Sequence, residues 1–214
     1  MTTYPSGNQQ IRIEQQVLSG DRKHPALLLL HGSGGNISFW LDRFALALTQ
    51  VGVAAFAPHY FEKTGTARAT PELILDGKHF PAWLTAIEDA ITYISSRPTI
   101  DPKRIAVLGI SLGGYLAMAL AARETRLRAV VELSGGMPPG MEASLSPATP
   151  PVLVLHGAAD STVPVTEAHR LARLLDQHRV PHQVEIFPGE THWFSQAAQA
   201  KLLRTCGAFL VRRL

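Results

Sequence analysis

Apolar residues follow two alternating patterns along the chain. Some fill short uninterrupted runs, which are typical of strands buried on both faces, and others recur at helical spacing over longer stretches. One further run, 11–18, alternates apolar with polar residues, as an edge strand does. The predicted strands are 11–18, 26–30, 53–57, 105–110, 129–133, 152–155 and 182–187. The predicted helices are 39–50, 78–96, 112–123, 166–177 and 196–211.

The order of these elements indicates the fold class. Strands and helices alternate from residue 26 onward, which predicts an α/β fold with a mostly parallel, doubly wound sheet of about seven or eight strands and helices on both faces. The 214 residues suffice for one domain, 1–214, with a substantial core. Two longer irregular stretches, 59–77 and 134–150, follow predicted strands, and ligands of such sheets bind beyond the carboxyl ends of the strands.

Charge and composition narrow the classes of partner. The net charge of +3 comes from scattered basic residues without an aromatic platform, so we expect no nucleic-acid partner. No apolar run approaches the roughly 20 residues of a membrane span, and the polar N-terminus lacks a signal pattern, so we expect a cytoplasmic protein with no membrane partner. Cys206 is the only cysteine and no Cys/His group has metal-ligand spacing, so we expect no disulfide, metal or cofactor. A monomer and a homodimer are both compatible with the sequence.

The stretch GISLGG at residues 109–114 lies between a predicted strand and a predicted helix. Gly109 and Gly113 let the two backbones pass closely, and the residue at the apex of such a turn is exposed at the helix N-terminus. This context predicts Ser111 as a catalytic nucleophile. The alternative is a structural turn with an incidental serine.

A serine hydroxyl becomes a nucleophile when a base removes its proton. His192 lies in the predicted loop between the last strand and the last helix, which puts it at the same sheet edge as Ser111. His31 and His156 end two strands in matching His-Gly pairs, and we expect them to brace turns. His192 is therefore the predicted base.

The base needs an acid that fixes its tautomer. Asp160 follows a predicted strand between Ser111 and His192, and the chain order Ser…Asp…His predicts it as that acid. The structural alternative is a turn or helix-cap aspartate. Glu132, near the end of the strand 129–133, is the rival acid.

Negative charge on a reacting carbonyl oxygen needs preorganised N–H donors. One predicted donor is the backbone N–H of Leu112, directly after the nucleophile. The other comes from the turn HGSGG at residues 31–35, through Ser33 or Gly34. No phosphate-binding glycine string is present in the sequence.

The motifs HGSGG, GISLGG, HGAADSTVP and GETHWF together resemble those of the α/β-hydrolase superfamily, from about Ala26 to the C-terminus. Within it, the compact size and the stretch APHY at residues 57–60 are most similar to the dienelactone hydrolase family. The resemblance implies an eight-stranded, mostly parallel sheet, a nucleophile–Asp–His triad at Ser111, Asp160 and His192, and no metal. The family carries a cysteine where this chain has Ser111, and a glutamate where it has Gly32.

These features predict a serine carboxylesterase that hydrolyses small-molecule esters through an acyl-enzyme on Ser111. A thioesterase or a dienelactone or prolyl-oligopeptidase-like hydrolase of small substrates uses similar machinery, since the serine together with Tyr60 also resembles the latter group. The alternative of another class is a non-catalytic ligand-binding protein on a hydrolase scaffold. The stretch 134–150 is too short for a large cap domain, so we expect an open pocket and short acyl chains. The expected walls of this pocket are Tyr60, Phe61, Met137 and Trp193.

Overall fold

The computed structural model describes residues 2–20, 22–37 and 47–214. Eight strands in these ranges form one sheet: β1 (Thr3–Ser6), β2 (Gln9–Gln16), β3 (His24–Leu30), β4 (Ala54–Pro58), β5 (Ile100–Ile110), β6 (Leu127–Leu133), β7 (Val152–Gly157) and β8 (His182–Phe187). The α-helices with defined bounds are α2 (Pro71–Leu75), α3 (His79–Ser95), α4 (Leu112–Ala121), α5 (Thr166–Gln177) and α6 (Gln196–Val211). Two short 3-10 helices are η1 (Tyr60–Thr64) and η2 (Glu142–Ser144).

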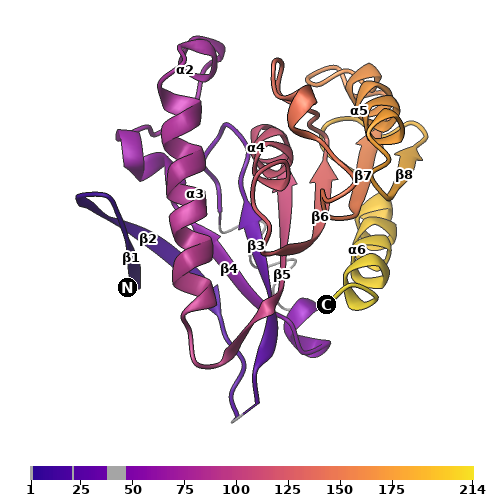
Figure 1. Ribbon diagram of the computed structural model, residues 1–214. Coiled ribbons are helices and arrows are strands. Elements are labelled where there is room, and N and C mark those ends of the chain that lie inside the picture. The colour runs from indigo at the N-terminus through magenta and orange to yellow at the C-terminus, as the bar shows by residue number, and fades with distance from the viewer. Residues whose placement is uncertain (1, 21, 38–46) are drawn as a thin grey trace.

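The strands follow one another across the sheet in the order β1-β2-β4-β3-β5-β6-β7-β8 (Figure 1). β1 pairs antiparallel with β2, and β2 pairs antiparallel with β4. Every other pairing is parallel. The predicted fold class is therefore confirmed, and the parallel strands all end at one edge of the sheet.

Each face of the sheet packs on its own apolar cluster, because alternate residues of a strand point to opposite faces. In β3, Leu28 and Leu30 belong to the cluster that α3, α4 and α5 cover. Leu27 and Leu29 belong to the other cluster, which α6 covers. Burial on both faces explains why the central strands have uninterrupted apolar runs.

Most predicted elements are present with shifted ends, and β1 is an addition. This strand is too short to give a periodic signal, yet Tyr4 within it is fully buried and its hydroxyl donates to the Ala86 carbonyl. Most of the predicted helix 39–50, namely residues 39–46, lies outside the described residues. Residues 47–50 are helical. No helix in the described ranges is long and apolar enough to cross a bilayer.

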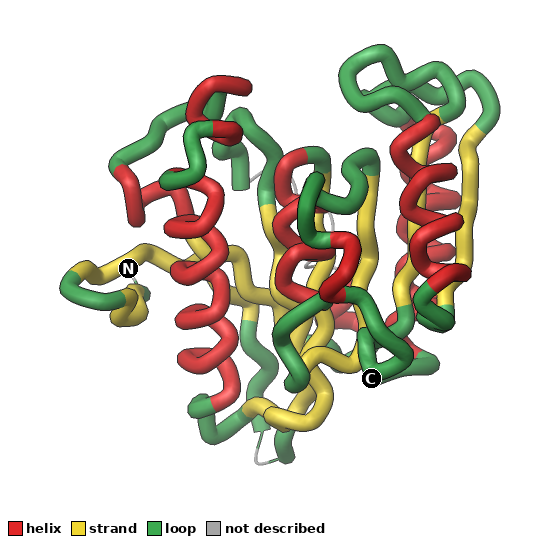
Figure 2. The backbone as a smooth tube through the Cα atoms, turned by 45° about the horizontal axis from the view of Figure 1, so that its top comes forward, coloured by secondary structure: helices red, strands yellow, loops and turns green. Residues whose placement is uncertain are grey.

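The two long irregular stretches are partly ordered by local structure. The stretch 59–77 contains η1 and α2, and 134–150 contains only η2. Arg170 of α5 holds the second stretch in place, because its guanidinium donates to the Met137 carbonyl and pairs with Glu142 at 3.1 Å. Figure 2 shows loops at both ends of the strands, and the arrows of Figure 1 show the end at which the parallel strands finish.

The turn from β5 into α4 brings three backbone segments into contact. A Cβ on Gly109 would lie 1.9 Å from the carbonyl oxygen of Gly113, and a Cβ on Gly113 would lie 2.3 Å from the carbonyl oxygen of Leu30. Neither position can hold a larger side chain unless the backbone of β3 or α4 moves.

The variant Gly113→Ala should therefore lower the free energy of unfolding by about 3 kcal/mol or more, the upper part of the range for overpacking. Gly207→Ala is the matched control, because a Cβ at Gly207 in α6 would meet nothing within 4 Å. It should raise stability by about 0.5–1 kcal/mol, since glycine weakens a helix interior. Urea unfolding measures both variants, and equal stabilities would contradict the close contact.

Candidate active site

Ser111 is held in a strained conformation at the turn before α4. Its φ of 56° and ψ of −121° lie where residues other than glycine rarely occur, at a cost on the order of 1–3 kcal/mol. The strain persists because neighbouring hydrogen bonds fix the backbone. The Ser111 N–H donates to the Leu133 carbonyl at 2.8 Å, and the Ser111 carbonyl accepts from the Gly114 N–H at 2.8 Å. The predicted strand–turn–helix geometry is thus present.

The HGSGG turn after β3 lies directly against Ser111. A Cβ on Gly32 would be 3.2 Å from the Ser111 Cβ and 3.7 Å from its Oγ. Among the described residues, the N–H groups of Ser33, Gly34 and Leu112 have no protein acceptor, so they are free to bind a negatively charged oxygen. Leu112 is the first donor that the sequence predicts, and Ser33 and Gly34 are the two alternatives for the second.

His31 braces this turn, as predicted. Its Nδ1–H donates to the Gly32 carbonyl at 2.8 Å, and its ring stacks on Tyr60 with 4.1 Å between centroids. The Tyr60 hydroxyl donates to the His31 carbonyl at 2.6 Å. Burial lowers the pKa of His31 from 6.5 to about 4, so the imidazole is neutral at physiological pH and adds no charge beside the turn.

Asp160 and His192 are joined by a short hydrogen bond. The His192 Nδ1–H donates to Asp160 Oδ2 at 2.7 Å, which leaves the lone pair on Nε2 of His192. Asp160 Oδ1 accepts the N–H groups of Thr162 and Val163, each at 2.9 Å. The Asp160 side chain is fully buried, so these donors replace water around its carboxylate.

A second histidine lies beside the same carboxylate. His156 at the end of β7 is fully buried, its Nε2–H donates to the Val163 carbonyl at 2.8 Å, and Nε2 lies 3.4 Å from Asp160 Oδ2. Burial lowers the pKa of His156, so its neutral form is favoured. The prediction that this histidine braces a turn is confirmed.

Backbone contacts fix the loops after β7 and β8 against each other. The Ala159 N–H donates to the Glu190 carbonyl at 2.8 Å, and a Cβ on Gly157 would lie 2.4 Å from the same oxygen. Glu190 in turn accepts the backbone N–H and the hydroxyl of Ser195, which caps α6. His192 lies between these anchors, so its position is set by both loops.

The expected pocket walls divide into two groups. Tyr60 and Met137 have no exposed surface and Phe61 is 4% exposed, and all three pack in the core. These side chains present no open wall to a ligand, which corrects the expectation for them: the stretches that carry them fold inward onto α3 and α4. Trp193, in contrast, is 73% exposed beside His192.

Glu132, the rival acid, makes no hydrogen bond with His192. Its Oε1 accepts the Gly135 N–H, and a Cβ on Gly114 would lie 2.9 Å from that oxygen, so the carboxyl packs beneath the turn that holds Ser111. Burial raises the pKa of Glu132 to about 8, and Oε2 has no hydrogen-bond partner in the described residues. The residue is an uncharged buried acid over much of the physiological pH range.

The sequence does not predict the side chains that hold the loops of the site in place. Arg170 and the Glu190–Ser195 pair hold loops; Arg170 lies in none of the four motifs, and in GETHWF the sequence assigns a role to His192 but none to Glu190. The Arg170–Glu167 spacing of three residues on a helix is the one local signal, and it is common on solvated faces.

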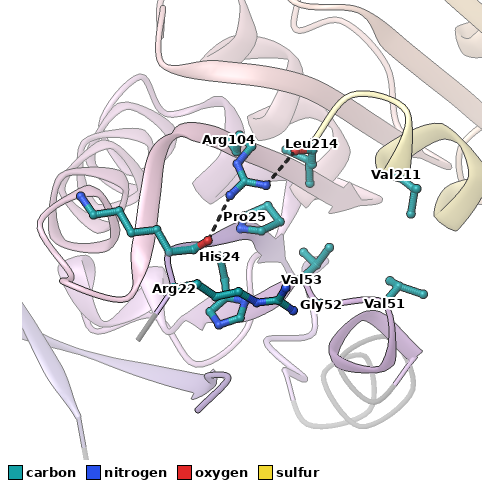
Figure 3. Close-up of a pocket in the computed structure, with 10 residues that line it drawn as sticks. Arg22, His24, Pro25, Val51, Gly52, Val53, Arg104, Val211 and Leu214 are labelled. Atoms are coloured by element: carbon teal, nitrogen blue, oxygen red, sulfur yellow. Dashed lines mark hydrogen bonds between the residues drawn. The ribbon is translucent and has the colours of Figure 1, made fainter. Parts of the chain in front are cut away.

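A hollow of about 270 Å³ lies at the other end of the sheet, near the amino ends of β3 and β5 (Figure 3). Arg104 lines it but is already engaged, because it pairs with Asp101 and donates to the carbonyl oxygens of Lys23 and Leu214. Ser111 follows the opposite end of β5, so this hollow is separate from the candidate active site.

This sheet order, with its chemistry at the carboxyl edge, is that of an α/β hydrolase. The sequence matches the dienelactone hydrolase family over residues 15–204, and the chain therefore belongs to that family.

Two curated relatives are similar to this chain over part of their own length. The chain is 35% identical over 112 residues to the quorum-quenching protein AidA of Acinetobacter baumannii, covering 50% of this chain and 34% of that protein. It is 25% identical to dipeptidyl-peptidase 5 of Porphyromonas gingivalis over an alignment 237 residues long, which covers 91% of this chain and 34% of the peptidase. The chain thus spans about a third of the length of these two relatives.

Solved structures share the fold at low identity. A dienelactone hydrolase-like promiscuous phosphotriesterase from metagenomic libraries superposes with a TM-score of 0.84 at 20% identity, covering 99% of this chain and 96% of that one. Est1E from Butyrivibrio proteoclasticus has a TM-score of 0.78 at 17% identity, covering 99% and 98%.

The buried acid Glu132 gives a pH-dependent prediction. Its carboxyl ionises near pH 4.5 when unfolded and near pH 8 when folded, so its stabilising contribution is full below pH 4.5 and is lost as the pH rises to 8. Each pKa unit corresponds to about 1.4 kcal/mol. Glu132→Gln keeps the acceptor for Gly135 but cannot ionise, so it should lose less stability than wild type between pH 5 and pH 8 in urea unfolding.

The control is Asp101→Asn, because the Arg104 guanidinium and the Lys103 N–H lower the pKa of this carboxyl. Asp101 stays ionised across the whole interval and its partner is an arginine that does not titrate there, so its replacement should leave the pH-dependent loss as in wild type. A Glu132→Gln variant that loses as much stability as wild type would contradict a protonated Glu132.

Proposed function

We propose that the protein is a serine carboxylesterase, with Ser111 as nucleophile, His192 as base and then acid, and Asp160 as the orienting acid. The observation that carries the proposal is the buried Asp160 carboxylate, which accepts the His192 Nδ1–H at 2.7 Å. Burying a carboxylate away from water costs free energy, so a buried carboxylate indicates a function. Holding the imidazole in one tautomer is such a function.

The reaction begins when Nε2 of His192 takes the Ser111 hydroxyl proton as Oγ attacks the ester carbonyl carbon. The carbonyl oxygen becomes negatively charged and binds the N–H of Leu112 together with that of Ser33 or Gly34. Asp160 stabilises the imidazolium that forms. The tetrahedral intermediate then collapses, the C–O bond to the alcohol breaks, and His192 gives its proton to the departing oxygen.

Water completes the cycle by the same steps. His192 removes a proton from water, the hydroxide attacks the acyl carbon, and the bond to Ser111 Oγ breaks as His192 returns the proton to the serine. The products are the carboxylic acid and the free enzyme. Thioesters can follow the same route, and a thiohydrolase of Arthrinium phaeospermum is 29% identical over 114 residues, so thioester hydrolysis is the second candidate activity.

Loss of the nucleophile or of the acid should remove most turnover. Ser111→Ala removes the attacking oxygen, and Asp160→Asn replaces the acceptor of the Nδ1 proton, which favours the wrong tautomer; each should lower kcat for phenyl acetate by roughly 10³–10⁴-fold or more. Ser96→Ala, an exposed serine after α3, is the control and should keep wild-type activity. Unchanged turnover in Ser111→Ala would refute the proposed mechanism.

We further propose a preference for short acyl chains. The stretch 134–150, where a cap covering the acyl chain would be inserted, holds only the three-residue η2, and Tyr60 and Met137 fill the core instead of opening a channel. An open site buries few methylene groups, each worth ~0.8 kcal/mol, so longer chains gain little.

A series of p-nitrophenyl esters from acetate to palmitate measures this preference. The value of kcat/KM should be highest for acetate or butyrate, and lipid interfaces should not activate the enzyme. A value of kcat/KM that keeps rising beyond octanoate would require a buried acyl channel and would contradict the open site.

A further inference from the structure

Trp193 is an exposed aromatic side chain on a firmly held loop. It is 73% exposed, whereas the next residue, Phe194, is 8% exposed and packs edge-on against Phe187 with 5.1 Å between ring centroids. The Trp193 N–H donates to the Thr191 hydroxyl oxygen at 3.3 Å, and that hydroxyl donates to the Trp193 carbonyl at 3.1 Å. These bonds therefore fix the backbone that carries the indole, and the indole does not pack in the core.

The indole lies next to the base of the proposed reaction. Its ring centroid is 5.6 Å from that of His192, with the two planes at 90°. The alcohol that leaves must lie beside His192, because it takes its proton from Nε2. The carbonyl oxygen lies instead by Leu112 and the turn at Gly32, so Trp193 borders the alcohol half of an ester rather than its acyl half.

The two polar side chains that precede His192 on this loop are already engaged. Both carboxylate oxygens of Glu190 accept from Ser195, and the Thr191 hydroxyl is bonded to the Trp193 backbone. A sugar alcohol would need free hydrogen-bonding groups beside the aromatic face, whereas an aromatic ring needs only the face itself. The surroundings of Trp193 therefore favour an aromatic alcohol.

We propose that Trp193 is a specificity residue that stacks on the leaving alcohol, and that the substrates of this enzyme are esters of alcohols carrying an aromatic ring. This inference rests on the proposed esterase function. It adds selection by the alcohol half of the substrate to the short-chain selection proposed for the acyl half.

Benzyl acetate and cyclohexylmethyl acetate test the proposal, because they share the acyl group and the carbon skeleton and differ in the flatness of the ring. Wild type should favour benzyl acetate in kcat/KM by about three- to tenfold, the range expected for one aromatic pair. The ratio should fall to near one in Trp193→Ala and Trp193→Leu, and Trp193→Phe should keep most of it. Val211→Ala, a 56% exposed apolar residue at the end of α6, should keep the full ratio.

The other outcomes contradict the proposed role of Trp193. A wild-type ratio near one, or a high ratio that persists in Trp193→Leu, overturns the role of Trp193 while leaving the esterase function intact. If wild type hydrolyses neither ester, the proposed function fails and this inference fails with it. Trp193→Leu keeps an apolar side chain without a flat face, so it replaces Trp193→Ala if that variant does not fold.

Discussion

The close backbone contact at the turn between β5 and α4 is the constraint on which the site depends. Gly109 and Gly113 have no room for a Cβ, because the first turn of α4 lies against the end of β5 and against the Leu30 carbonyl at the end of β3. At this turn Ser111 adopts a positive φ of 56°. Gly32 also lies close to Ser111, since a Cβ on the glycine would be 3.2 Å from the Ser111 Cβ, so the nucleophile and the predicted oxyanion turn are positioned by one packing arrangement.

A second glycine contact joins the other half of the site. Gly157 pairs with Phe187 in the parallel register of β7 and β8, and its lack of a side chain lets the loop after β8 cross close above it. Asp160 and His192 therefore come from loops that are fixed to each other by backbone, and their hydrogen bond does not have to hold the loops together. The carboxylate keeps its remaining lone pairs on backbone donors, which makes it a stable anchor for the imidazole.

The sequence predicts the parallel sheet and the places of Ser111, Asp160 and His192 because these follow from element order and from which edge each loop occupies. It predicts Tyr60 and Met137 as pocket walls incorrectly, since periodicity cannot distinguish an aromatic or methionine side chain facing a pocket from one facing the core. Glu132 fits the chain order of an acid, but the direction of its carboxyl towards Gly135 depends on tertiary packing that no local pattern reports.

The central claim is that the folded protein activates Ser111, and covalent labelling tests it most directly. A fluorophosphonate probe reacts with a serine oxygen only when a base and an oxyanion site act on it together. Intact mass followed by peptide mapping should find one adduct on the peptide that contains Ser111, and urea-unfolded protein should give none. An adduct on another residue, or no adduct in the folded protein, would contradict the account.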